Sequence, residues 1–273
     1  MRGDKADVID SPRNGRVVAA RELHSARGRR TAGAFLAEGP HAVAEACAAG
    51  FAIREAFVTD ESAGRDKPLM RDLARLSVPI HTVTERALRA VAETVTPQGV
   101  VAVVDAPPVA ELPATPRLVT VLEKCSDPGN AGTVIRTADA VGADAVVLGA
   151  GSVDVWSGKC VRSSAGSVFH VPVVTSLSAL DAVTALRAGG CQVFATAADG
   201  DVDLDDLASG DRLAGPTAWV FGSEAHGIGS EIRGLVDAAV RIPIRGRAES
   251  FNLAAAVAIC LYSSARVQRG AAS

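Results

Sequence analysis

The sequence has no Cys-x-x-Cys pair, no long apolar run and no recognisable targeting segment. Its cysteines are odd in number and widely spaced, which argues against a disulfide framework and against a zinc site. The longest apolar run, 253–262, is about half of the ~20 residues that a membrane span requires. The first ten residues, MRGDKADVID, lack the apolar stretch of a secretory signal. We therefore expect a soluble cytoplasmic protein with reduced thiols and no bound metal. The five cysteines are Cys47, Cys125, Cys160, Cys191 and Cys260.

The charge of the chain is unevenly distributed. The 273 residues, 48% of them hydrophobic, are enough for two domains or one large α/β unit, and the net charge is −3. Between residues 13 and 30, however, six arginines accompany a single acid, Glu22. A local basic block in a mildly acidic protein predicts an anionic partner bound at one end. The arginines are Arg13, Arg16, Arg21, Arg27, Arg29 and Arg30.

Helical and strand patterns alternate over the first hundred residues. The pattern predicts a helix over 15–28, a strand over 34–39 and a helix over 40–50 that begins at Pro40. The alternation continues to about residue 105. Residues 106–116 then hold four prolines, which lack the donors that a sheet or helix needs, so this segment is the predicted linker.

A second α/β series follows the linker. Continuous apolar strands separated by helices indicate a mostly parallel sheet that is covered on both faces. Strands are predicted near 118–123, 144–149, 171–174, 191–196, 217–222 and 239–244, and helices near 131–142, 177–189, 229–236 and 252–267.

The stretch DPGNAGTVIRTADA (127–140) combines a predicted helix start with an arginine that points away from the apolar face. Asn130 is well placed to cap this helix. Two interpretations of Arg136 are open. It is a solvated surface side chain, or it faces a substrate together with Asn130 above the strand ends, where open α/β sheets bind ligands.

Two further stretches place polar residues next to buried elements. In WVFGSEAHGIG (219–229), Glu224 lies within a glycine-rich loop after an apolar strand, and such a loop lets backbone groups approach a ligand closely. A glycine-rich strand–helix turn is the structural alternative. In IPIRGRAESFNLAAAVAICLY (242–262), Ser250 or Asn252 would cap the last, buried helix. Capping does not account for Arg245 and Arg247, which reach either an anion or water.

Residues 146–167 carry a weaker signal. GAGSVD after a strand begins like the dinucleotide fingerprint G-x-G-x-x-G, but Asp154 replaces the third glycine and the expected acid about 20 residues later is missing, so we reject this site. Lys159 and Arg162 lie one helical turn apart. This spacing fits either a pair of phosphate ligands or a basic turn exposed to solvent.

Taken in order, the three main stretches resemble the three motifs of the SpoU (TrmH) family of RNA ribose 2′-O-methyltransferases. KCVRSSAGS (159–167) resembles the segment that this family carries between its first two motifs, and the likeness covers about 117–266. Phe251 and Ala254 depart from the usual leucine and serine. The opening 14–40 resembles an L30e-like substrate-binding domain, an arrangement similar to that of the thiostrepton-resistance 23S rRNA methyltransferases. The matching residues are Asn130, Gly132 and Arg136; Phe221, Gly222, Glu224, Gly227, Ile228 and Gly229; and Ile242, Pro243, Gly246, Glu249, Ser250, Asn252 and Leu253.

The resemblance implies an α/β fold with an L30e-like RNA-binding domain (1–105), the linker (106–116) and a trefoil-knotted SPOUT methyltransferase domain with a parallel sheet (117–273). The knot could not be inferred from residue patterns, since knots are nearly absent from proteins. S-adenosylmethionine is the implied cofactor, and the family is typically homodimeric. The implied catalytic residues are Asn130, Arg136, Glu224, Ser250 and Asn252, and the implied cofactor-binding residues are Thr196, Ala197, Gly222, Ile242, Ser250 and Leu253.

The residue roles follow from the chemistry of methyl transfer to a hydroxyl. Arg136 would stabilise the charge that develops on the ribose oxygen, because arginine stays protonated in proteins. The other four catalytic residues would orient Arg136 and the ribose by hydrogen bonds. The arginine block, with Lys159 and Arg162, would contact RNA phosphates. Few aromatic residues accompany that block, so folded-RNA shape is the expected target. The separate N-terminal domain, by analogy with the family, favours rRNA over tRNA.

Two other classes of function remain. A non-catalytic RNA-binding assembly factor with the same fold would not need all five polar site residues. A small-molecule α/β enzyme would not need the arginine block. Among RNA substrates, tRNA is the alternative to 23S rRNA.

Overall fold

The computed structural model describes residues 8–223 and 227–271. They form two compact units: an N-terminal unit of residues up to Pro108 together with Trp156–Phe169, and a C-terminal unit of Val109–Val155 together with the residues from His170 onward. Residues 156–169 therefore pack with the N-terminal unit, although the family resemblance places them in the sequence of the methyltransferase domain.

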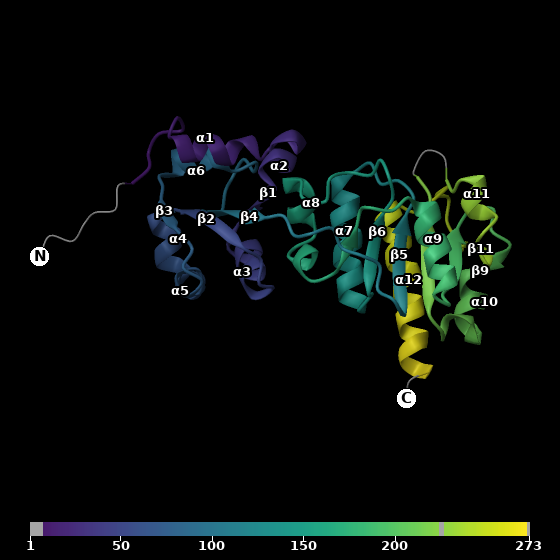
Figure 1. Cartoon of the computed structure of the whole chain (residues 1–273). Coiled ribbons are helices and arrows are strands. Elements are labelled where there is room, and N and C mark those ends of the chain that lie inside the picture. The colour runs from purple at the N-terminus through teal and green to yellow at the C-terminus, as the bar shows by residue number, and fades with distance from the viewer. Residues whose placement is uncertain (1–7, 224–226, 272–273) are drawn as a thin grey trace, which may run out of the picture. The chain divides into compact units, whose positions relative to one another are not determined.

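The N-terminal unit is built on a four-stranded sheet of order β1-β4-β2-β3. Strand β4 is antiparallel to β1 and β2, whereas β2 and β3 are parallel. Helices α1 and α6 cover one face of the sheet, and α3, α4 and α5 lie on the other (Figure 1). The elements are α1 (Gly15–Glu22), α2 (Ala26–Ala32), β1 (Ala34–Glu38), α3 (Pro40–Ala48), β2 (Ile53–Val58), α4 (Asp60–Arg65), α5 (Lys67–Arg75), β3 (Ile80–Thr82), α6 (Glu85–Val91), β4 (Val100–Asp105), α8 (Gly158–Ser163) and the 3-10 turn η1 (Ser167–Phe169).

The single helix expected over 15–28 is two helices. Helix α1 ends at Glu22, and the Ser25 hydroxyl then accepts a hydrogen bond from the backbone N–H of Gly28, which makes Ser25 the N-cap of α2. Serine is a strong N-cap because its short side chain satisfies an orphan helix donor. The prediction of one helix was wrong because the helical pattern of apolar residues continues across Ser25 and so does not mark the break between the two helices.

The C-terminal unit contains a seven-stranded sheet of order β7-β6-β5-β10-β8-β11-β9 in which all neighbouring pairs are parallel. The predicted parallel sheet is confirmed. The elements are β5 (Leu118–Leu122), α7 (Pro128–Val141), β6 (Ala145–Leu148), β7 (Val173–Val174), α9 (Ala179–Ala188), β8 (Gln192–Thr196), β9 (Val202–Asp203), α10 (Leu204–Ser209), η2 (Asp211–Leu213), β10 (Thr217–Phe221), α11 (Ser230–Arg233), β11 (Ala238–Arg241) and α12 (Leu253–Ala271).

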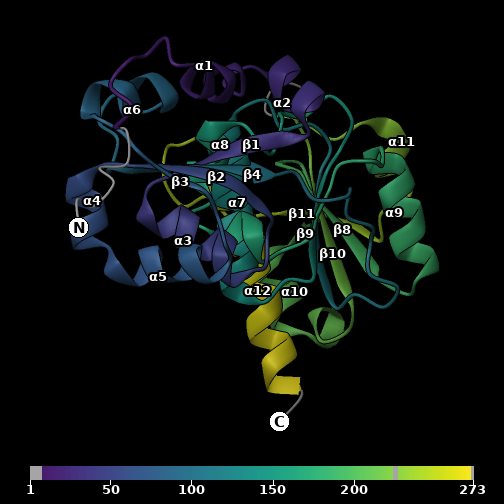
Figure 2. The same cartoon turned by 60° about the vertical axis from the view of Figure 1, so that its left-hand side comes forward.

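Helices cover both faces of this sheet, which explains why its strands read as unbroken apolar runs. Helices α9 and α11 lie on one side and α7 and α12 on the other (Figure 2). Alternate residues of each strand face the same side of the sheet. Val119 and Val121 of β5, for example, belong to the same hydrophobic cluster as the buried residues of α9. On the opposite face Trp219 is fully buried, and its indole N–H donates to the hydroxyl of Ser264 on α12 at 2.8 Å.

Aromatic side chains fix both ends of the segment 156–169 in the N-terminal unit. Trp156 stacks on Phe35 with ring centroids 4.4 Å apart, and Phe169 meets Phe51 edge-on at 5.0 Å. Such pairs add about 0.5–1.5 kcal/mol each beyond the area they bury. Helix α8 lies between these two anchors and contacts β1.

All five cysteines are buried and unpaired with one another. Burial raises the pKa of the Cys47, Cys191 and Cys260 thiols, so these groups stay protonated at neutral pH. None of the helices in the described residues is long and apolar enough to cross a membrane. Those residues also contain no His, Cys, Asp and Glu cluster suited to a metal ion.

Candidate active site

A pocket opens at the carboxyl edge of the parallel sheet. Thr196 is the last residue of β8 and Ala197 follows it, and Ile242 and Ile244 follow β11. Strands β8 and β11 pair directly, with Thr196 opposite Val240, so their two loops emerge side by side. Ser250, shortly before α12, also lines the pocket. Four residues expected in the cofactor site thus share one pocket: Thr196, Ala197, Ile242 and Ser250.

The wall of this pocket is mostly apolar with a few polar groups. Ile242, Ile244 and Phe251 supply the apolar surface, and Thr196, Glu249 and Ser250 supply the polar groups. This mixture suits a small organic ligand with an apolar ring and a hydrogen-bonding edge. An adenosyl group has this character, so the residues present fit S-adenosylmethionine. Gly222 and Leu253 do not line the pocket.

Gly222 serves a neighbouring loop. The backbone of Ser223 and Gly227 closes this loop by two hydrogen bonds, of 3.0 and 2.9 Å. A β-carbon on Gly222 would lie 2.1 Å from the carbonyl carbon of Gly227, so only glycine permits this approach. Glu224 lies outside the described residues.

The two predicted asparagines meet between α7 and α12. The Asn252 side-chain amide donates to the side-chain oxygen of Asn130 at 3.3 Å. The Asn252 oxygen accepts from the backbone N–H of Ala254 at 2.9 Å and thereby caps α12. Asn252, rather than Ser250, is therefore the cap of the last helix, and it holds Asn130 through its remaining amide.

The expected capping role of Asn130 was wrong. Helix α7 begins at Pro128, and its cap is Asp127, whose carboxylate accepts from the backbone N–H of Asn130 at 2.9 Å. Proline suits the first helical position because it lacks the N–H that would remain unpaired there. The Asn130 side chain is thus released from capping and faces Asn252.

Arg136 lies on the exposed side of α7 and does not line the pocket at the sheet edge. It follows Asn130 by six residues, which on an α-helix is a rotation of about 240°. It lines an open groove between α7 and α12 with Thr133, Ile259 and Tyr262. Among the described residues no hydrogen bond joins Arg136 to Asn130, Ser250 or Asn252, so the expected orientation of Arg136 by these groups is not present in this chain alone.

Two polar contacts that the sequence did not indicate position the loops around the site. The Glu123 carboxylate accepts from the backbone N–H of Gly229 at 3.1 Å, which ties the end of β5 to the start of α11. Arg233 on α11 donates to Asp199 in the loop after β8 at 2.9 Å, and this hydrogen bond lowers the pKa of the Asp199 carboxyl. No local pattern could identify these partners, because they are more than 30 residues apart in the chain.

Most arginines of the basic block are exposed on the N-terminal unit. Arg13, Arg21, Arg27 and Arg30 are exposed, and so is Arg16, which pairs with Glu55 at 3.1 Å. An exposed ion pair of this kind contributes little to folding stability, so the arginine remains available to bind an anion. Lys159 is also exposed.

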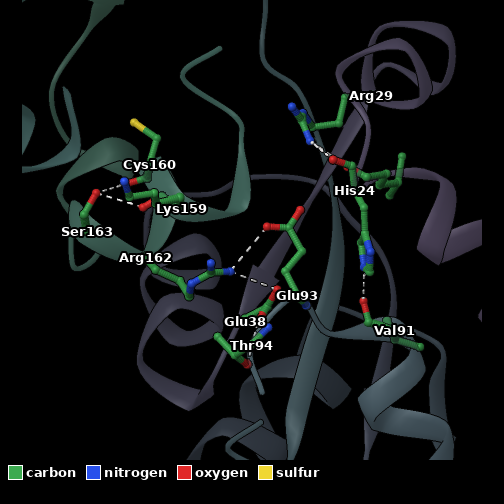
Figure 3. Close-up of polar contacts among 11 residues, drawn as sticks. His24, Arg29, Glu38, Val91, Glu93, Thr94, Lys159, Cys160, Arg162 and Ser163 are labelled. Carbon is green, nitrogen blue, oxygen red and sulfur yellow. Dashed lines mark hydrogen bonds and ion pairs between the residues drawn. The ribbon is translucent and has the colours of Figure 1, made fainter. Parts of the chain in front are cut away.

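Two of the predicted phosphate ligands, Arg29 and Arg162, also have partners within the protein. Arg29 is only 7% exposed and donates to the carbonyl oxygens of Leu23 and His24, which lack partners after the end of α1. Arg162 lies within ion-pair distance of Glu38, at 3.2 Å, and Glu93, at 3.5 Å (Figure 3). The sequence shows that both side chains are positively charged. It does not show which carbonyl and carboxylate oxygens lie next to them in the folded chain.

The parallel α/β sheet has a pocket at its carboxyl edge that Ser250 lines, and Asn252, which holds Asn130, follows Ser250 by two residues. This arrangement defines the class as an α/β enzyme that binds its ligand at the strand ends. Residues 117–262 match the SpoU rRNA Methylase family, and residues 14–102 match the MRM3-like substrate binding domain. The chain therefore belongs to the SpoU rRNA methylase family, as the three motifs predicted.

Similar proteins support this assignment over nearly the whole chain. The chain is 37% identical over 254 residues to the 23S rRNA (guanosine(2553)-2'-O)-methyltransferase RlmP of Bacillus subtilis, covering 93% of this chain and 97% of that protein. An AdoMet-bound rRNA methyltransferase from Sinorhizobium meliloti is 30% identical, with a TM-score of 0.82 over 94% of this chain and 97% of the other. The SpoU methyltransferase AviRb from Streptomyces viridochromogenes with AdoMet is 30% identical, with a TM-score of 0.81 over 94% of this chain and all of that one.

Proposed function

We propose that this chain transfers the methyl group of S-adenosylmethionine to a ribose 2′-hydroxyl in 23S rRNA. The observation that carries the proposal is the pocket that gathers Thr196, Ala197, Ile242 and Ser250 at the sheet edge. The named activity of RlmP and the AdoMet-bound neighbours support the cofactor and the RNA class. The exposed arginines of the N-terminal unit supply the positive charge that an RNA substrate requires.

The cofactor supplies an electrophilic methyl group on a sulfonium, so the protein's main task is to position and activate the acceptor hydroxyl. The apolar wall of Ile242, Ile244 and Phe251 binds the ligand and excludes water. The cap of Asn252 fixes the start of α12, and its amide fixes Asn130 beside it. In-line placement of the acceptor oxygen accounts for much of the rate gain. The guanidinium of Arg136 stabilises the negative charge that develops as the hydroxyl loses its proton.

Methyl incorporation into RNA tests the proposed function. Purified protein should transfer label from S-adenosylmethionine to 23S rRNA, and nuclease digestion should place the label on a ribose 2′-oxygen. RNA from cells with and without the protein should then differ at one 2′-O-methyl site in 23S rRNA. Label on a base, or in tRNA alone, would contradict the proposal. Absence of S-adenosylmethionine binding by calorimetry would favour the assembly factor instead.

The groove between α7 and α12 supports a homodimer as part of this proposal. Tyr262 is 58% exposed there and lies beside Ile259 and Ala258 from α12 and Ala140 from α7. An apolar face that includes a large exposed aromatic side chain is typical of a protein interface. The last helix, expected to be buried, is thus buried on one side only. Association through this face would bring Arg136, which lines the same groove, next to a second copy of the chain.

We expect Tyr262→Glu to convert a dimer into monomers, because it places a charge within the apolar face. Light scattering coupled to gel filtration measures the molar mass in solution. In Tyr262→Glu this mass should fall to that of one chain, and the rate of methyl transfer should fall as well. Arg266→Ala, an exposed change on the same helix outside the groove, should leave both unchanged. A wild-type chain that stays monomeric at micromolar concentration would refute the dimer.

A further inference from the structure

The N-terminal unit contains a second pocket, of about 310 Å³, that is separate from the predicted cofactor site. Its walls are the start of α3, the loop 94–98 before β4, and residues 161–166 around the end of α8. The volume lies at the lower end of the range of roughly 300–1,000 Å³ that small-ligand pockets occupy. The proposed function of the chain gives this pocket no role.

The loop 93–98 is held rigidly at both ends. At its start the buried Glu38 carboxylate accepts from the backbone N–H groups of Glu93, at 2.8 Å, and Thr94, at 3.3 Å, and from the Thr94 hydroxyl at 2.9 Å (Figure 3). At its end Arg65 donates to the carbonyl oxygen of Gln98 at 3.0 Å. The loop is therefore fixed before any ligand arrives, which lowers the entropic cost of binding.

Two side chains of this rigid loop, those of Val95 and Gln98, have no structural task of their own. Val95 is 93% exposed at the tip of the loop. The Gln98 carboxamide makes no hydrogen bond to any residue that the structure describes, and its oxygen lies 2.8 Å from where a β-carbon of Gly39 would be. Because Gly39 has φ +90° and no side chain, the carboxamide can lie directly against the start of α3. An amide with free donors and a free acceptor at a pocket wall is a recognition group.

The charge of the pocket decides which part of an RNA it accepts. Arg162 faces two carboxylates, Glu38 and Glu93, so the three groups together carry a net negative charge. A phosphate placed here would face that charge at short range, which disfavours it. Only one nitrogen of Arg162 takes part in these ion pairs, and its other N–H groups remain available to a neutral acceptor. A nucleobase offers such acceptors without a charge.

We propose that this pocket binds an unpaired nucleobase of the RNA substrate, with Gln98 and Arg162 hydrogen-bonded to its edge and Val95 packed against its neighbour. Unpaired bases in loops and bulges are the parts of a folded RNA that proteins read most specifically. The exposed arginines of α1 and α2 belong to the same unit and would hold the flanking phosphates. This proposal rests on the proposed function, since it names the part of the substrate that the N-terminal unit reads.

The test compares the double variant V95S/Q98A with V109S/Q192A, which makes the same two changes at exposed positions outside this pocket. A 23S rRNA transcript is the probe, measured by filter binding over a series of salt concentrations and by methyl transfer over a series of RNA concentrations. We expect V95S/Q98A to raise the RNA Kd and KM about tenfold. Its kcat at saturating RNA and its S-adenosylmethionine affinity should equal those of the wild type, and V109S/Q192A should behave as the wild type throughout.

Salt dependence separates a base contact from a phosphate contact. The slope of log Kd against log salt should be the same for V95S/Q98A and the wild type, whereas R27A/R30A should reduce it, because each lost phosphate contact lowers the slope by about one. An unchanged RNA Kd, an equal effect of V109S/Q192A, or a reduced slope in V95S/Q98A would each overturn the nucleobase site. If instead the wild type binds the transcript but transfers no methyl group, the proposed function fails while the binding data still decide the pocket.

Discussion

Substitution of Arg136 by alanine should lower methyl transfer by roughly 10²–10³-fold or more, the effect found when one preorganised charge-stabilising group is removed from an active site. The guanidinium is the group proposed to stabilise the developing charge on the ribose oxygen. Its side chain is exposed on α7 and makes no hydrogen bond to the described residues, so the fold does not depend on it. A surface change of this kind usually alters stability by less than about 0.5 kcal/mol.

Three measurements isolate this effect. Single-turnover methyl transfer gives the chemical rate, calorimetry gives the affinity for S-adenosylmethionine, and thermal unfolding gives stability; only the first should change in Arg136→Ala. Arg136→Lys should recover part of the rate, because it keeps the charge but loses the planar fork of donors. Arg266→Ala removes an exposed arginine from α12 and should have wild-type activity. A chain with Arg136→Ala that methylates RNA at the wild-type rate would refute the assignment.

The parts of the fold that sequence predicted best are those set by local chemistry. The buried strands of the C-terminal unit are continuous apolar runs such as LVTVL and TAWVF, because helices cover both faces of the sheet. Helix α3 begins at Pro40, as expected. By contrast, β9 and α10 escaped prediction, since the two-residue strand and the short helix carry no periodic apolar pattern.

The parts of the site that sequence missed depend on partners distant in the chain. The position of Asn130 near the helix start predicts that it caps α7, yet Asp127 is the cap. The Asn130 side chain instead accepts a hydrogen bond from Asn252, 122 residues away. The ion pair of Glu38 with Arg162 joins residues that lie 124 positions apart in the chain. The sequence predicted Arg162 as a phosphate ligand and did not indicate this internal partner. Motifs identify which residues are polar and near a loop, but only folding determines which acceptor each donor meets.

Gly222→Ala is the second change from which we expect a large effect. The new β-carbon would lie 2.1 Å from the carbonyl carbon of Gly227 and 2.3 Å from its oxygen, and backbone atoms cannot move aside as a flexible side chain can. The two hydrogen bonds between Ser223 and Gly227 must therefore break or lengthen. Since this loop follows β10 at the same sheet edge as the pocket, we expect the affinity for S-adenosylmethionine to fall at least about tenfold, a loss of ~1.4 kcal/mol.

Gly215→Ala is the matched control, because Gly215 precedes β10 as Gly222 follows it, and a β-carbon there meets no atom within 4 Å. Both variants add one methyl group beside the same buried strand, so general effects on the sheet are shared. Calorimetry with S-adenosylmethionine and thermal unfolding should show that Gly215→Ala matches the wild type in both. Gly222→Ala should lose cofactor affinity while the sheet still unfolds cooperatively. Equal cofactor affinity in the two variants would mean that the closed Ser223–Gly227 loop has no part in the site, whatever its resemblance to the second family motif.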